Sequence, residues 1–563
     1  KKDLLAENSP IARFASDSMR VILRGTQLYG RLLQESHHPD FLRDCLDRDR
    51  LFSRLWRKAM EDPRYTSVAA AEIYDLHQND VPLFTTRPNS RHIWTSTGQQ
   101  IPDFFAESSM DRVHRRLTQL GDKDFGLQKW LIKTSLMAFV KSAQSPSPTA
   151  LELQSGERYH AAQFVEAARL IGDQLEILAM IHEESAMWFN VNFSDGYLAG
   201  VESTGFSFYE GLCGICFYLA YLGHTTQEDR YTRLAKQALN TIRQQTTASQ
   251  NYIKSVGAYS GWGGVIYMLV HLAALWKDPS LISEAEMMVT RLPDLITQDN
   301  GFDLISGTAG CLAALLMLYH AHPTAQTLKV AALCGDHLLS HARTLETGIG
   351  WQTISGQEDC LTGFSHGTAG IAWALLQLAD VTGEVKFKTT ALEAIRYERS
   401  QFLPEQRNWR NLLNPQKRSA EEILPAMVQW CHGAPGIGLA RLSMLDDAYA
   451  HQEIRIAIET TLAQGFGHGQ CLCHGDLGNL DLILQAAQKL NDPQLMQQAY
   501  TLGSSILESI THSGCYCGVP MGIEVPGLMT GIAGIGYGLL RLADPEHIPS
   551  VLTLDSPVAS PAH

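Results

Sequence analysis

Long apolar runs recur along the chain, and each opens with two glycines three residues apart. The pattern G-x-x-G followed by apolar residues occurs seven times, as GLCGICFYLAYL at Gly211, GWGGVIYMLVHL at Gly261, GTAGCLAALLML at Gly307, GTAGIAWALLQL at Gly367, GAPGIGLARLSM at Gly433, GDLGNLDLILQA at Gly475 and GIAGIGYGLLRL at Gly531. A helix that is apolar nearly all round is buried, and glycine lets backbones approach closely where helix ends converge. The pattern therefore predicts seven buried helices.

The segments between these runs are amphipathic instead. In residues 231–242 (YTRLAKQALNTI), one helical face carries Tyr231, Leu234, Ala235, Ala238, Leu239 and Ile242. Successive runs begin 42 to 66 residues apart, which leaves room for two helices and their loops. We therefore predict an all-α fold, an α/α toroid of seven inner helices wrapped by seven outer helices. Helical pairs also stack into open solenoids, and the pattern alone does not separate the two arrangements.

The first 145 residues contain no such run and carry more charge. A Ser- and Pro-rich stretch, SAQSPSP at residues 142–148, is typical of a linker and places a domain boundary near residue 150. We therefore predict one part over residues 1–150, a second over residues 151–550, and a flexible tail over residues 551–563.

Composition narrows the class of protein. Hydrophobic residues make up 45% and charged residues 18% of the 563 positions, as in globular proteins, and the net charge of −14 argues against nucleic acid or an anionic membrane surface as partner. No apolar run is long enough to span a membrane, and the N-terminus lacks a signal-peptide core. The eleven cysteines, an odd number, indicate reduced thiols in the cytoplasm. Because the chain opens on Lys1 rather than Met, we expect it to be a fragment; its oligomeric state stays open.

Chemistry-bearing residues fall into two equivalent slots of the repeated pattern. His366, His432 and His474 directly precede the first glycine of three runs, and these histidines are preceded by Ser365, Cys431 and Cys473. If the ring closes, these loops face one central opening. Cys and His are preferred zinc ligands. A lone Cys or His is more often an ordinary packed residue, but two Cys-His-Gly triplets in equivalent slots favour a metal site.

The motifs WCHGAPGIGLA (430–440), CLCHGDLGN (471–479), FSHGTAGI (364–371) and GLMTGIAGIGYGLLRLADP (527–545) resemble the signature motifs of the lanthionine synthetase C-like family. RVILRGTQLYGRLL from Arg20 and DVPLFTTRPNSR from Asp80 resemble the end of the kinase-like dehydratase domain of class II lanthipeptide synthetases. The resemblance covers about residues 155–550 for the first family. It implies that the chain is the C-terminal portion of a bifunctional lanthipeptide synthetase, with a partial dehydratase region over residues 1–150 and a cyclase toroid over residues 151–550.

The resemblance implies an activity and a zinc cofactor. Zinc is held by Cys431, Cys473 and His474, and an open fourth position takes a cysteine of a ribosomally made precursor peptide rich in Ser, Thr and Cys. The thiolate adds to dehydroalanine or dehydrobutyrine and forms lanthionine or methyllanthionine. His366 corresponds to the acid/base residue, since an imidazole titrates near neutral pH, and Asp303 matches an aspartate that orients His366 or the substrate.

For the N-terminal part, the resemblance implies a phosphate-eliminating pair, Arg20 and Thr26, although Gly25 stands where a proline is expected. The ligands of ATP and Mg²⁺ would lie upstream, so these cofactors apply only if that upstream part is present. We therefore expect this chain to cyclise a peptide but not to phosphorylate it.

Plainer interpretations remain for several residues. His432 is not a ligand in the family pattern, Asp303 also suits a helix start, and Cys213 and Cys216 are best explained as core thiols. Cys471, Cys515 and Cys517 lie on predicted loops, and Cys471 would compete as a ligand only if its loop turned inward.

Two other functions also stay open. One is a different toroidal zinc thiol transferase, similar to a protein prenyltransferase. The other is a non-catalytic toroid that binds peptides and uses His432 or Cys471 as the fourth ligand of a structural zinc. An exchangeable zinc position would favour an enzyme, whereas a saturated site would favour the binding module.

Overall fold

The computed structural model describes residues 2–6, 8–137, 160–194, 197–413 and 425–558. The chain divides into two compact units, Lys1–Gly126 and Leu127–His563, and the division falls inside helix α7 (Asp122–Met137). The predicted boundary near residue 150 and the predicted linker at residues 142–148 lie outside the described residues.

The N-terminal unit combines short helices with an antiparallel sheet. In the described residues the sheet has the strand order β1 (Met19–Val21), β2 (Phe84–Thr86), β3 (Ile93–Trp94) and β4 (Gln100–Ile101). The helices of the unit are α1 (Lys2–Leu5), α2 (Thr26–Ser36), α3 (Cys45–Phe52), α4 (Trp56–Glu61), α5 (Tyr65–His77) and α6 (Ser109–Gln119). Glu72 of α5 is buried and accepts hydrogen bonds from Arg24 at 2.7 Å and from the Tyr29 hydroxyl at 2.6 Å. This carboxylate therefore ties α2 to α5.

The inner layer of the C-terminal unit follows the repeated glycine pattern. Seven inner helices can be identified in the described residues: α9 (Leu212–Thr226), α11 (Trp262–Trp276), α14 (Thr308–Ala321), α16 (Thr368–Thr382), α18 (Ala434–Arg441), α20 (Asp476–Lys489) and α22 (Ile532–Ala543). Each begins one residue after the first glycine of a run, so the prediction of seven buried helices is confirmed. The second glycine gives each helix room, because a Cβ on Gly310 would lie 2.0 Å from the carbonyl oxygen of Leu304. Apolar as these helices are, no helix in the described ranges has the combined length and hydropathy needed to cross a membrane.

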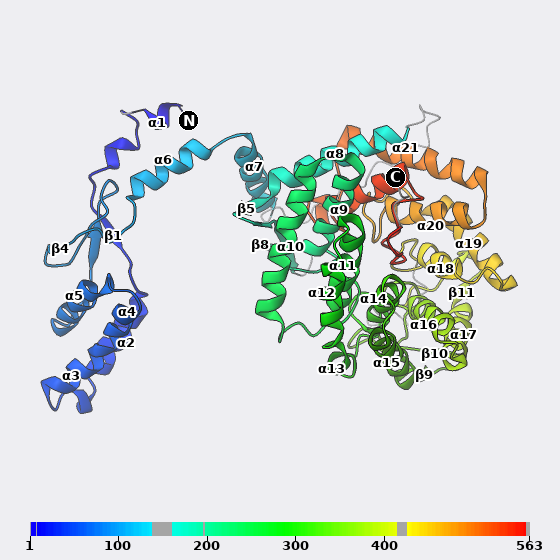
Figure 1. The fold of residues 1–563 in the computed structure, drawn as a ribbon, viewed down its shortest axis with the longest axis horizontal. Helices are drawn as coiled ribbons and strands as arrows, with labels where there is room; N and C mark the ends of the chain where they lie inside the picture. The colour runs from blue at the N-terminus through cyan, green and yellow to red at the C-terminus, as the bar shows by residue number, and fades with distance from the viewer. Residues whose placement is uncertain (1, 7, 138–159, 195–196, 414–424, 559–563) are drawn as a thin grey trace. The chain divides into compact units, whose positions relative to one another are not determined.

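Amphipathic helices form the outer layer. They are α8 (Ala161–Leu178), α10 (Asp229–Ser249), α12 (Ser280–Val289) with the short α13 (Leu292–Ile296), α15 (Ala325–His341), α17 (Val385–Ser400), α19 (Ala448–Gln464) and α21 (Pro493–Ser513). The face predicted for residues 231–242 is the buried face of α10. Figure 1 shows these helices following one another around a single ring, from α8 in cyan to α21 in orange.

Small two-stranded sheets interrupt the helices, and the periodicity did not predict them. The pairs are β5 (Met180–His182) with β6 (Ser185–Met187), β7 (Phe189–Ser194) with β8 (Tyr197–Ser203), β9 (Arg343–Thr344) with β10 (Ile349–Gly350), and β11 (Phe402–Leu403) with β12 (Asn408–Trp409). Each pair lies in a connection from an outer helix to the next inner helix.

Backbone hydrogen bonds join the loops that precede the inner helices into a closed circuit. The N–H donors and carbonyl acceptors are Tyr209 to Tyr259 (2.9 Å), Tyr259 to Ile305 (3.1 Å), Leu304 to Ser365 (3.1 Å), Ser365 to Cys431 (3.3 Å), Cys431 to Cys473 (3.4 Å), Cys473 to Met529 (2.9 Å) and Met529 to Tyr209 (2.8 Å). Because the last bond returns to the first loop, the helices form a toroid and not an open solenoid.

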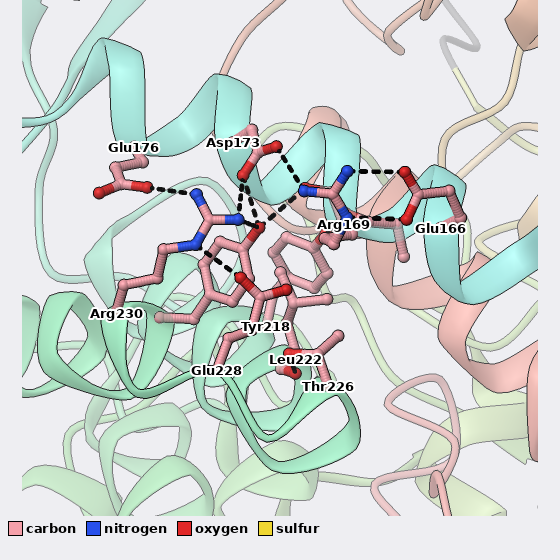
Figure 2. Close-up of polar contacts among 11 residues, drawn as sticks. Glu166, Arg169, Asp173, Glu176, Tyr218, Leu222, Thr226, Glu228 and Arg230 are labelled. Carbon is pink, nitrogen blue, oxygen red and sulfur yellow. Dashed lines mark hydrogen bonds and ion pairs between the residues drawn. The ribbon is translucent and has the colours of Figure 1, made fainter. Parts of the chain in front are cut away.

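Charged side chains fix the first outer helix in this ring. Arg169 and Asp173 of α8 form an ion pair at 3.0 Å, and Asp173 also pairs with Arg230 of α10 at 2.6 Å. The hydroxyl of Tyr231 donates to Asp173 at 2.6 Å. Figure 2 shows the two arginines on either side of this carboxylate. Single ion pairs at the surface contribute little, but this network sets how α8 lies across α10.

The C-terminal segment fills the centre of the ring. Val551, Leu552 and Leu554 are buried. The Tyr259 hydroxyl donates to the carbonyl of Val551 at 2.7 Å, and the Trp430 indole donates to the carbonyl of Leu552 at 3.2 Å. The prediction of a flexible tail from residue 551 is therefore wrong for residues 551–555. A ring of helices leaves an apolar hole, and this segment buries its own apolar side chains there.

Candidate active site and metal centre

The predicted site residues lie on neighbouring loops of the hydrogen-bonded circuit. Asp303 precedes α14, His366 precedes α16, Cys431 precedes α18, and Cys473 and His474 precede α20. The inner helices start in register, so equivalent sequence slots become adjacent positions on one side of the ring. The structure therefore brings these five residues into one region, as the sequence predicted.

His366 and Asp303 form a hydrogen-bonded pair. The Nδ1 atom of His366 lies 2.5 Å from Oδ2 of the buried Asp303. A carboxylate only accepts hydrogen bonds, so Nδ1 carries the proton and Nε2 is the nitrogen available for exchange. The other Asp303 oxygen accepts the N–H groups of Ser306 at 2.8 Å and Gly307 at 3.0 Å, at the start of α14. One carboxylate thus contacts His366 and also holds the turn that leads into α14, although the helix N-cap itself, Gly307, receives no side-chain cap.

His432 packs beside this pair. Its ring stacks on that of His366, with centroids 6.1 Å apart and an angle of 26° between the planes. Burial, followed by the nearby His366, lowers the pKa of His432 to about 4. His432 is therefore neutral at physiological pH, and its position agrees with the packing role that the sequence suggested.

The three predicted metal ligands touch one another. The pKa of the buried Cys473 thiol is raised well above its ordinary value, first by its hydrogen bond with the Cys431 thiol and then by burial. His474 lies beside the thiols of Cys471 and Cys473, and these neighbours raise its pKa to about 11. Cys431, Cys473 and His474 therefore form a continuous chain of contacts.

These contacts are pairwise. Within the described ranges, no three His, Cys, Asp or Glu side chains hold their donor atoms around a common metal position. Protonated thiols hydrogen-bond to each other and to imidazole, whereas a metal binds the deprotonated ligands. Two buried thiols and one partly buried imidazole, which already lie next to one another, are a donor set that fits zinc.

Sequence reasoning missed two neighbours of the thiols. Tyr209 hydrogen-bonds to Cys473, and burial, followed by the cysteines, raises the pKa of its phenol. Tyr209 stands two residues before Gly211, the slot that Cys431 and Cys473 occupy in their runs, so the repeat itself was the available clue. Gly518, which borders His474, lies in no repeated slot and had no such clue.

Three other cysteines differ in whether they lie in the helical core or beside the predicted metal ligands. Cys213 and Cys216 are fully buried on α9, so their interpretation as core thiols is confirmed. Cys471 is buried and contacts His474, so its loop turns inward.

In the N-terminal unit, Arg20 lies on β1 and Thr26 is the first residue of α2, and both are exposed. Gly25 has a φ of −58°, close to the value of about −65° that proline imposes. The backbone there retains the geometry of the expected proline. The roles of Arg20 and Thr26 in phosphate elimination stay predictions.

Comparison with known proteins follows the division into two units. A family model described as lanthionine synthetase C-like protein matches residues 202–553, and a model described as a domain of unknown function (DUF4135) matches residues 1–87. A lacticin 481/lactococcin biosynthesis protein, LcnDR2 of Lactococcus lactis subsp. lactis, is 21% identical over 556 residues, which cover 94% of this chain and 56% of that protein. The chain thus spans little more than half the length of this relative.

Two further similarities cover about half or more of the chain. The glutathione S-transferase LANCL1 of Danio rerio is 24% identical over 352 residues, covering 51% of this chain and 82% of that protein. The solved structure of nisin cyclase shares the fold with a TM-score of 0.50 and 20% identity, covering 62% of this chain and 92% of that one. The resemblance to class II lanthipeptide synthetases is confirmed by these matches together. Since the family model spans more than half of the sequence, the chain belongs to the lanthionine synthetase C-like family.

Proposed function

We propose that this chain closes thioether rings in a ribosomally made precursor peptide rich in Ser, Thr and Cys. A peptide cysteine adds to dehydroalanine or dehydrobutyrine and gives lanthionine or methyllanthionine. The observation that carries this proposal is the juxtaposition, on adjacent loops of one circuit, of the Cys431, Cys473 and His474 contacts with the His366–Asp303 pair. Membership of the family and similarity to a lacticin biosynthesis protein support it.

Cys431, Cys473 and His474 are the residues that would hold a zinc ion. Zinc bound by three protein ligands supplies an open position at which an incoming thiol is held as the thiolate. The two cysteine protons must leave when the metal binds, so we expect zinc affinity to fall as the pH falls.

His366 supplies the proton that completes the addition. The proton of the peptide thiol passes to Nε2 of His366. The peptide sulfur forms a bond to the β-carbon, the electrons of the carbon–carbon double bond move toward the neighbouring carbonyl, and the α-carbon takes that proton from Nε2. Asp303 holds Nδ1–H throughout and stabilises the imidazolium before transfer. His432, being neutral, does not add positive charge beside it.

The dehydrated residues must come from a reaction that removes the hydroxyl groups of Ser and Thr. Arg20 and Thr26 remain our proposed residues for phosphate elimination, since an arginine clamps a leaving phosphate well. ATP and Mg²⁺ would be cofactors only if an upstream dehydratase part is present. We place these reactions in the cytoplasm, where thiols stay reduced.

Thiol transfer to a small electrophile is a second candidate function. The zebrafish relative is named a glutathione S-transferase, and a site that holds a peptide thiol also suits the thiol of a tripeptide. A non-catalytic toroid with a structural zinc requires a fourth protein ligand. Cys471 lies beside His474 and is the candidate for that fourth ligand.

The test uses a synthetic, already dehydrated peptide with one cysteine. Ring closure leaves its mass unchanged and removes one alkylatable thiol, so alkylation followed by mass spectrometry measures it. Cys473→Ala should lose most bound zinc and all ring closure, whereas His366→Asn should retain zinc and react about 10²–10⁴-fold more slowly. Cys515→Ala, a half-buried loop cysteine of the same unit, is the matched control.

Full zinc content and full activity in Cys473→Ala would contradict the ligand assignment. Consumption of glutathione by an added electrophile, with the peptide thiol left free, would favour the second candidate.

A further inference from the structure

Cys471 is more completely buried than either predicted cysteine ligand. Its exposed fraction is 1%, against 9% for Cys431 and 5% for Cys473. The carbonyl of Cys471 accepts the N–H of Gly478 in the first turn of α20, which fixes the loop that also carries Cys473 and His474. A buried thiol in this position has a role beyond packing only if its sulfur contacts another polar group.

That partner is His474. A Cβ added to Gly518 would lie 2.5 Å from Sγ of Cys471 and 2.8 Å from Nε2 of His474, so the sulfur and this nitrogen border the same small space. Gly518 is held against them because its N–H donates to the carbonyl of Thr530 at 2.7 Å. Only a residue without a side chain lets the three groups meet.

The imidazole of His474 therefore has a thiol on each of two sides. The sulfur of Cys471 borders the same space as Nε2, and Cys473 also lies beside the ring; the ring has two nitrogens. A histidine that binds a metal through one nitrogen almost always donates the N–H of the other to a fixed acceptor. With Nε2 beside Cys471, Nδ1 is the nitrogen left for a metal shared with Cys473.

We infer that Cys471 is a positioning residue for the metal centre, whose sulfur accepts the Nε2–H of His474 and so fixes the tautomer that directs Nδ1 to the metal. This inference rests on the proposed zinc site. It also assigns Gly518 the role of keeping open the space in which that hydrogen bond forms. Sulfur is a weak acceptor, and the bond therefore works by orientation more than by strength.

The experiment measures zinc affinity and ligand count, with catalysis as a separate readout. Zinc affinity comes from competition with a chromophoric chelator, and the number of bound thiolates comes from the sulfur-to-metal charge-transfer absorption of the cobalt(II) protein. Cys471→Ala and Cys471→Ser are compared with Cys517→Ala, in which an equally buried cysteine, 1% exposed, is removed next to Gly518.

We expect Cys471→Ala to weaken zinc binding about 10–100-fold, with the cobalt charge-transfer intensity unchanged because Cys431 and Cys473 still bind. Cys471→Ser should recover part of the affinity, since its hydroxyl oxygen accepts the same hydrogen bond. Gly518→Ala should weaken zinc as Cys471→Ala does, and Cys517→Ala should resemble the unmodified chain.

Zinc affinity in Cys471→Ala equal to that of the unmodified chain would overturn the inference. A charge-transfer band weaker by one thiolate in the same variant would also overturn it, because Cys471 would then be a direct fourth ligand. If the unmodified chain bound no zinc or cobalt, the proposed zinc site itself would fail and the role of Cys471 with it.

Discussion

Replacing Asp303 by Asn isolates the link between this carboxylate and His366. Oδ2 of Asp303 accepts the Nδ1–H of His366 at 2.5 Å, while Oδ1 accepts the N–H groups of Ser306 and Gly307 in the turn before α14. An asparagine keeps one oxygen that still accepts these two N–H groups. On the other side it presents an amide N–H₂, which cannot accept the imidazole proton. The variant should therefore fold normally and lose only the interaction with the imidazolium.

The size of the effect follows from the bond that is lost. A hydrogen bond to a charged group contributes about 1.5–3 kcal/mol, and each 1.36 kcal/mol is a factor of ten in rate. We therefore expect Asp303→Asn to slow ring closure about 10- to 150-fold while zinc content stays unchanged. The assay is the loss of free thiol from the dehydrated peptide, measured under single-turnover conditions.

Asp299 offers a matched control. It is a second aspartate of the same loop, and its Oδ2 accepts the N–H groups of Phe302 at 3.0 Å and Thr308 at 2.9 Å. Asp299→Asn should therefore disturb the loop to a similar degree without touching His366. Equal rate losses in the two variants, or no loss in Asp303→Asn, would refute the assignment of Asp303 as the residue that orients His366.

Two further predictions concern stability. Glu398 and Arg441 form a buried ion pair at 2.8 Å, and Glu398 also accepts the N–H of Gly363 at 3.1 Å. Because Glu398→Gln leaves the Arg441 charge buried without this partner, it should lower the free energy of unfolding in urea at pH 8 by about 3 kcal/mol. An unchanged free energy of unfolding would argue against the pair. Burial lowers the pKa of His271 to about 3, and its Nδ1 lies 2.6 Å from the Tyr221 hydroxyl. Between pH 6.5 and 3 the unfolded chain binds a proton that the folded chain does not, so folding should lose about 2 kcal/mol from pH 7 to pH 5 through this residue. His271→Gln should remove that part of the pH dependence, and identical dependence in both proteins would contradict the origin we assign to it.

The sequence by itself determined the layers of the C-terminal unit. A helix start and an apolar stripe depend on residues within a few positions of each other, so Gly367 and the run after it already specify a buried helix. The repetition of that unit predicts equivalent slots, and these slots identify His366, Cys431 and Cys473 from the sequence alone. Tyr209 occupies the same slot, but a tyrosine is not a preferred zinc ligand, so the slot alone does not single it out.

The tertiary structure alone decided which distant groups meet. Closure of the ring brings the Met529 N–H to the carbonyl of Tyr209, two residues that hold the same slot of the first and last runs but stand 320 positions apart. Gly518 stands 44 positions after His474. Its lack of a side chain matters only because the closed ring places it beside that imidazole. Residues 551–555 carry no periodicity, yet they fill the hole that only a closed ring of helices creates. Local periodicity determines the secondary-structure elements. Contacts over long sequence separations form only when those elements pack together and bury their remaining apolar surface.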